Sequence, residues 1–99
     1  MLDMIEEEAR RNQLMQQEYI NRINHLPKGS LVTKKLGNHE YYYLKYREGK
    51  KTFTDYIGRD MEKVEEVRSQ LDKRKHFERM LRDLIKEYKL IMKATGGVQ

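Results

Sequence analysis

The hydrophobic positions of the first 27 residues recur at spacings compatible with one face of an α-helix. They are Leu2, Ile5, Ala9, Tyr19, Ile23 and Leu26. Asn12 and Gln16 dilute the middle of this face. Asp3 and the acidic residues after it suit a helix N-terminus because of the helix dipole. Pro27 disfavours helical backbone in the residue before it. The pattern predicts a helix over residues 2–25.

From residue 31 the pattern changes to an alternation with a period of two, which is typical of half-buried strands. Two turn signals divide it. Gly37-Asn38 has glycine at the first central position of a hairpin turn, and Glu48-Gly49 is a second two-residue candidate. The predicted strands cover about residues 31–36, 39–47 and 51–57.

Simple hairpin registers pair Leu31 with Leu44, and Leu44 with Phe53, which assigns each residue to one face of an antiparallel sheet. The more apolar face, which we expect to meet the helices, comprises Leu31, Thr33, Tyr42, Leu44, Tyr46, Phe53 and Ile57. The other face comprises Val32, Lys34, Leu36, Tyr41, Tyr43, Lys45, Arg47, Thr52, Thr54 and Tyr56. A slip of one residue would exchange the two faces.

Helical spacing returns over residues 60–93, where Asp60 suits the N-cap position. One apolar stripe consists of Val64, Val67 and Leu71. A second stripe, spaced 4-3-4-3, consists of Phe77, Leu81, Leu84, Tyr88 and Ile91; we call it the seam. Between the stripes the expected apolar position falls on Arg74. This phase slip indicates two functional halves of one helix, or a kink near residues 72–74.

These elements predict an α+β fold with an N-terminal helix, a three-stranded antiparallel sheet and a long C-terminal helix. We expect one domain over residues 1–95 and a loose tail over residues 96–99. A straight helix of this length would reach about 50 Å, farther than a small sheet can cover. The seam therefore needs the N-terminal helix or a second copy as its partner. Because Asn12 and Gln16 weaken the N-terminal helix, we expect a homodimer.

Composition narrows the class of protein. The 99 residues include no cysteine and no apolar run of the ~20 residues that span a bilayer. The acidic start is unlike a signal peptide, so we expect a cytoplasmic protein without membrane association. The net charge is +5, and residues 28–59 carry all of this excess, with eight Lys/Arg and three Asp/Glu. A local basic excess suits a polyanionic partner.

Enzymatic chemistry has little support in the sequence. His25, His39 and His76 lie far apart and lack partners at metal-ligand spacing, so no metal is expected. The chain contains no phosphate-binding glycine loop and no nucleophile elbow. Asp55 falls on the apolar face, where a catalytic role, an ion pair with Lys28 or Lys35, or a place at a strand edge are all open. We expect no enzyme activity, no cofactor and no small-molecule substrate.

Tyrosines and cations share the less apolar face of the predicted sheet. The candidate binding residues are Lys34, Tyr41, Tyr43, Lys45, Arg47 and Tyr56, with Lys50 and Lys51 at the hairpin tip. Tyrosine rings can stack on bases while lysine and arginine bind phosphates. Ordinary cross-strand pairing and lysine protection of strand edges would produce a similar pattern. We predict a non-enzymatic module that binds DNA or RNA.

The stretches 26–31, 41–51 and 56–58 resemble an uncharacterised family of small bacterial, archaeal and mobile-element proteins, over about residues 20–93. Three strands followed by a helix are also similar to the arm-type DNA-binding domain of integrases, whose sheet contacts the major groove. This chain departs from that domain in its first helix and its longer last helix. In size and character it resembles phage-encoded inhibitors such as anti-CRISPR proteins, which implies a Cas or other defence nuclease as the alternative partner.

Overall fold

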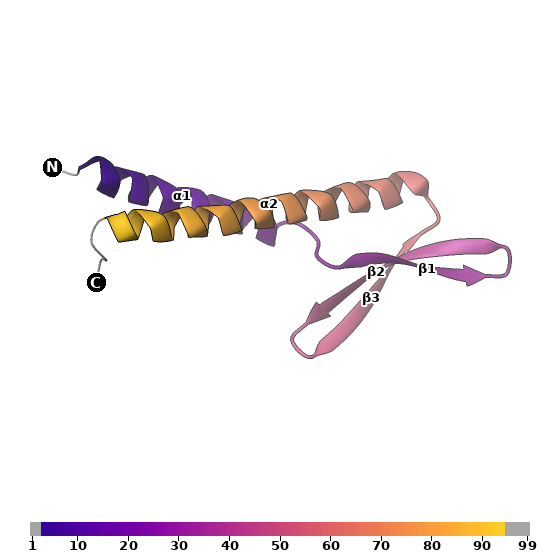
Figure 1. Cartoon of the computed structure of the whole chain (residues 1–99). Helices are drawn as coiled ribbons and strands as arrows, with labels where there is room; N and C mark the ends of the chain where they lie inside the picture. The colour runs from indigo at the N-terminus through magenta and orange to yellow at the C-terminus, as the bar shows by residue number, and fades with distance from the viewer. Residues whose placement is uncertain (1–2, 95–99) are drawn as a thin grey trace. The chain divides into compact units, whose positions relative to one another are not determined.

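A computed structural model describes residues 3–94 of the chain (Figure 1). In chain order the elements are α1 (Met4–Asn24), β1 (Ser30–Leu36), β2 (His39–Glu48), β3 (Lys51–Gly58) and α2 (Met61–Ala94). The predicted α+β class and element order are confirmed, and the boundaries agree to within two residues. The predicted tail at residues 96–99 and the predicted helix start at residue 2 lie outside the described residues.

The chain divides into two units. The helical unit contains α1 and the part of α2 from Lys75 onward, and the sheet unit covers Leu26–Arg74. The phase slip in the apolar pattern of α2 falls at this division, because Arg74 takes the position between the two stripes. The helix itself is unbroken from Met61 to Ala94.

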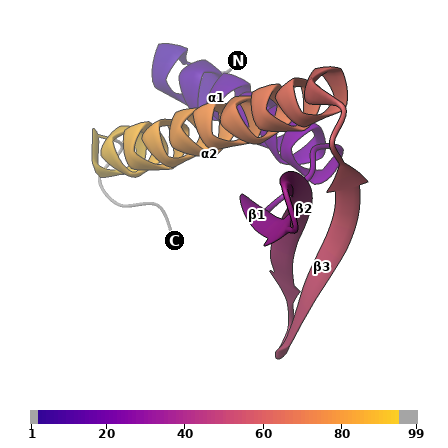
Figure 2. The same ribbon diagram turned by 90° about the vertical axis from the view of Figure 1, so that its right-hand side faces the viewer.

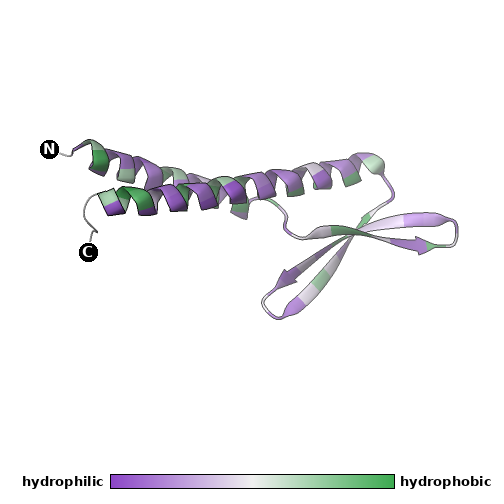
Figure 3. Cartoon of the chain, in the orientation of Figure 1, coloured by the Kyte–Doolittle hydropathy of each residue, from purple (hydrophilic) through white to green (hydrophobic). Residues whose placement is uncertain are grey.

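In the helical unit, α1 begins and ends as its sequence requires. The Asp3 carboxylate accepts a hydrogen bond from the Glu6 backbone N–H at 2.8 Å and so satisfies one free donor of the first turn. His25 follows the last turn, where its backbone N–H is bonded to the carbonyls of Arg22 and Ile23. Figure 3 shows apolar and hydrophilic segments interspersed along both helices, as expected for helices with one buried face each.

The seam of α2 packs against α1 in an antiparallel arrangement. Leu84 is buried with 8% exposure, and Ala9 and Ile23 are buried on α1. The Tyr19 and Phe77 rings lie 5.6 Å apart. The other seam residues, Phe77, Leu81, Tyr88 and Ile91, are half-buried. The first helix thus covers the centre of the seam and leaves its flanks partly exposed.

Asn12, which in the sequence seemed to weaken α1, is the most buried described residue of that helix, at 3% exposure. Its side-chain N–H₂ donates to the Leu84 carbonyl at 2.9 Å, and its oxygen accepts from the Gln16 amide at 2.7 Å. Gln13 donates to the Tyr88 hydroxyl at 2.9 Å. A buried amide is costly without such partners. The polar positions therefore join the two helices instead of interrupting their contact.

In the sheet unit the strands lie in the order β1-β2-β3, and both pairs are antiparallel. The register of β1 and β2 is confirmed, with Leu31 opposite Leu44 and Gly37 in the turn at a φ of 64°. The two hairpin tips lie at opposite ends of the sheet (Figures 1 and 2).

The predicted register of β2 and β3 was wrong by two residues. Leu44 lies opposite Asp55, and Phe53 lies opposite Tyr46. The turn uses Gly49-Lys50 instead of Glu48-Gly49, because Gly49, with a φ of 60°, takes the first central position as Gly37 does in the other hairpin. Since side chains alternate with a period of two, this shift leaves residues 52–56 on their predicted faces, whereas Ile57 has no register partner at the irregularity between Tyr42 and Tyr43.

At the start of α2, the Asp60 carboxylate accepts a hydrogen bond from the Glu62 backbone N–H at 2.9 Å, which confirms the predicted N-cap. Val64 and Leu71 of the first α2 stripe are buried. Arg74 donates a hydrogen bond to the Leu26 carbonyl at 2.8 Å.

Of the two sheet faces, the one predicted to be more apolar also has more of its side chains half-buried. They are Leu31, Tyr42, Leu44, Tyr46 and Ile57.

Leu84→Asp should unfold the helical unit, because it places a charge without a partner at the buried centre of the seam, at a cost of several kcal/mol. Leu90→Asp is the matched control, since Leu90 lies on the same helix at 66% exposure. Thermal unfolding followed by circular dichroism should show a large loss for the first variant and little change for the second. Equal stability of the two variants would contradict the packing described here.

Candidate nucleic-acid interface

The pleat of the sheet places all the acids of its described strands on one face, together with Lys35 and Lys51, and leaves the other face with cations alone. The registers place one set of side chains together, which we call the basic face: Ser30, Val32, Lys34, Leu36, His39, Tyr41, Tyr43, Lys45, Arg47, Thr52, Thr54 and Tyr56. Among the described strand residues, all three acids, Glu40, Glu48 and Asp55, lie on the opposite face. The basic face therefore carries three cations and no carboxylate.

Three tyrosine rings form a cluster in the middle of the basic face. Tyr43 lies opposite Tyr56 in the register, and their ring centroids are 5.4 Å apart with an angle of 65° between the ring planes. The Tyr41 ring lies 6.3 Å from that of Tyr56. Edge-to-face and tilted pairs at these distances are favourable, so the rings hold one another in place.

Two cations lie against this cluster. The Lys34 ammonium is 5.0 Å from the centroid of the Tyr43 ring, and the Arg59 guanidinium is 5.8 Å from that of Tyr41. Both distances allow cation–π attraction. Arg59 is a site residue that the sequence did not indicate. It follows an irregularity in the β2–β3 pairing between Tyr42 and Tyr43, and no alternation pattern extends across such a shift.

The remaining predicted residues are divided by the structure. Lys45 and Arg47 are exposed and lie on the basic face with Lys34. Lys50 lies in the β2–β3 turn, at one tip of the sheet. Lys51 lies opposite Glu48, so the register places it on the face away from the tyrosine cluster. Of the two predicted cations at the hairpin tip, Lys51 is thus not on the basic face, and Lys50 lies in the turn beyond its end.

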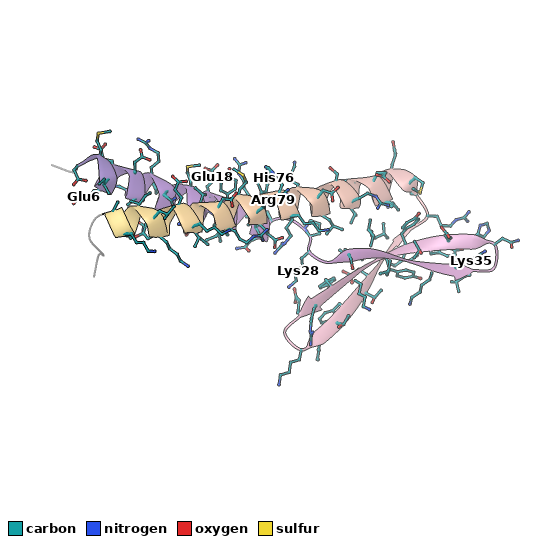
Figure 4. All side chains as sticks on the ribbon, in the orientation of Figure 1. Glu6, Glu18, Lys28, Lys35, His76 and Arg79 are labelled. Carbon is teal, nitrogen blue, oxygen red and sulfur yellow. The ribbon has the colours of Figure 1, made fainter. Side chains whose placement is uncertain are left out.

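On the opposite face, two rings contact each other and two of the acids have partners. The Tyr46 and Phe53 rings are stacked at 5.5 Å. Lys28 forms an ion pair with Glu48 at 3.9 Å, although the sequence left it as a candidate partner of Asp55. Asp55 is instead hydrogen-bonded to the Tyr46 side chain. Figure 4 shows Lys28 before the start of β1 and Lys35 near the tip of the first hairpin.

The pKa of the Tyr46 hydroxyl is raised above its ordinary value. Partial burial of the ring is the largest cause, followed by the hydrogen bond to Asp55 and by the negative charges of Asp55 and Glu48. All of these disfavour the tyrosinate anion. This carboxylate–phenol pair is a structural contact between two adjacent strands.

The histidines lie in separate elements. His25 caps α1, His39 begins β2 and His76 lies within α2. Over residues 3–94 no group of three or more His, Asp or Glu side chains is arranged to hold a metal ion. Neither helix, over its described length, is long and apolar enough to cross a membrane.

Comparison with known protein families matched residues 4–69 to DUF6788, a domain of unknown function. This match covers two-thirds of the chain. The chain belongs to the DUF6788 family. An uncharacterised family was expected from residues 20–93, and the DUF6788 match starts earlier and ends earlier. It contains all of the basic face, Arg59 and the start of α2, whereas the seam lies beyond it. No curated protein and no solved structure matched the chain.

Asp55→Asn should change how this DUF6788 protein responds to alkaline pH. A tyrosine whose pKa is raised by folding adds stability that is complete below about pH 10 and is lost as the pH rises through the raised value. The variant removes one cause of the increase, so the Tyr46 pKa should fall. Urea unfolding between about pH 9 and about pH 11 should then show a smaller loss of stability than in the wild type. Identical losses would contradict the Tyr46–Asp55 contact.

Proposed function

We propose that the chain is a cytoplasmic, non-enzymatic module that binds nucleic acid through the basic face of its sheet. The observation that carries this proposal is the absence of acids from one face of the sheet, over its described strands. Lys34, Lys45 and Arg47 share a face with no carboxylate, while Glu40, Glu48 and Asp55 lie behind it. A polyanion binds best to a surface that has no negative charges to repel it, so this face suits such a ligand.

The tyrosine cluster gives this face a second means of binding. Exposed cations alone attract any polyanion, and the contact is released by salt. Aromatic rings add stacking on bases, which occurs with any base sequence and depends much less on ionic strength than phosphate contacts do. The combination of rings at the centre and cations around them suits a ligand with planar bases on a charged backbone.

Lys34→Gln should weaken nucleic-acid binding, and Lys35→Gln is its matched control. The two lysines are neighbours on β1 and both are exposed, but only Lys34 lies on the basic face. Loss of one phosphate contact should reduce the slope of log affinity against log salt by about 1. Fluorescence anisotropy with labelled DNA and RNA, between about 50 and about 200 mM salt, measures both effects.

The result that would overturn the proposal is an absence of binding at low salt, or an equal loss in both variants. A pull-down with and without nuclease treatment shows what would replace it. A protein partner that is retained after nuclease digestion would indicate a protein-binding function, such as inhibition of a Cas or other defence nuclease. Loss of the captured material on digestion supports nucleic acid as the ligand.

We also propose that two copies associate through the helical unit. The centre of the seam is covered by α1, yet apolar side chains on both helices stay more than one-third exposed: Ile5, Leu14, Met15, Ile20 and Ile85. Burial of such area is the main favourable contribution to association. Sedimentation equilibrium should give the mass of two chains, and a single-chain mass at the highest concentration would exclude the dimer.

A further inference from the structure

The three rings of the basic face are not equally available to a ligand. Tyr41 and Tyr43 are half-buried, and each has a cation against it, Arg59 and Lys34 respectively. Tyr56 is 62% exposed. A base that approaches this face therefore meets the Tyr56 ring first.

The Tyr56 ring is also held in place before any ligand arrives. It packs against two other rings, that of Tyr43 in an edge-to-face arrangement and that of Tyr41 in a tilted one. Gly58 is also close to the ring, since a Cβ added there would lie 3.6 Å from the Tyr56 hydroxyl oxygen. A ring that is already ordered loses little conformational entropy on binding, which favours its use as a stacking surface.

From Tyr56 toward the start of β3, the basic face has short side chains on β3 and cations on β2. Thr54 and Thr52 are the next β3 residues on this face, and they lie opposite Lys45 and Arg47. The two cations are separated by two residues of β2, or about 7 Å. Short side chains in front of a row of cations leave room for a backbone whose phosphates follow the strand.

From this geometry we infer that the ligand of the basic face is a single-stranded segment of nucleic acid, with one unpaired base stacked on Tyr56 and its phosphates on Lys34, Lys45 and Arg47. This inference rests on the proposed function and makes it more specific. In a duplex the flat surface of each base is covered by its neighbours, so a ring that projects from a protein surface has nothing to stack on. Duplex readers rely on polar side chains aimed at base edges, whereas the centre of this face is aromatic.

The test compares a labelled oligothymidine and an oligouridine of about 12 nucleotides, a length suited to small single-strand-binding domains, with a duplex of the same length. Both single strands should bind more tightly than the duplex, since stacking on a ring needs only an exposed base. Any preference between the two single strands shows whether the sugar of DNA or of RNA fits better.

Tyr56→Ala should weaken single-strand binding by about 5- to 150-fold and leave duplex binding unchanged. Tyr56→Phe keeps the ring and should retain most of the affinity. Phe53→Ala is the control for loss of an aromatic ring as such, because Phe53 is also on β3 but faces the other way. Circular dichroism of each variant confirms that the sheet is intact.

Two results separate the failure of this inference from that of the proposed function. If Tyr56→Ala has no effect, or if the duplex binds as tightly as the single strands, while Lys34→Gln still weakens binding, the single-strand inference is wrong and the basic face remains the binding surface. If none of the three nucleic acids binds at low salt, both are wrong.

Discussion

The register of β2 with its two neighbours is the constraint on which the candidate site depends. Side chains alternate along each strand, so a slip of one residue would move every cation and every ring of the basic face to the other side. Two glycines with positive φ, Gly37 and Gly49, place the turns that hold this register. Three acids are excluded from the basic face by the same alternation. The electrostatic character of the surface is thus a consequence of two backbone turns.

The faces of the sheet could be predicted from the sequence even though one register could not. The glycine in the second turn was assigned to the wrong central position, which displaced β3 by two residues. An even displacement preserves the alternation, so Tyr43, Tyr56 and Lys45 kept their common face. The position of Arg59 against Tyr41 was beyond prediction, because it depends on the irregular pairing next to Gly58. Periodicity reports which side of a strand a residue occupies, but not what happens where the pairing shifts.

The helical unit shows a different limit of sequence interpretation. Apolar spacing located the seam correctly, but Asn12 and Gln16 appeared as interruptions of the apolar face. In the structure Asn12 binds the Leu84 carbonyl and the Gln16 amide within the contact between the helices. Whether a polar residue on the apolar face of a helix weakens or strengthens helix packing depends on its hydrogen-bond partner. For Asn12 that partner, Leu84, lies 72 residues away in the chain. Single-sequence periodicity contains no information on such a pairing.

The strand order has a consequence for how the protein behaves at high concentration. β1 and β3 each have a single neighbour, so each presents a row of backbone donors and acceptors along its outer side. A strand of another copy can form hydrogen bonds with such a row and add to the sheet as a fourth strand. Lys34 and Lys35 on β1, and Lys51 with Asp55 on β3, place charges along both rows. Each sheet that approached edge to edge would also bring its cations beside those of its neighbour. Dissolved salt weakens that repulsion, so the ionic strength that releases a polyanion from this surface also makes the sheet more prone to assemble with itself.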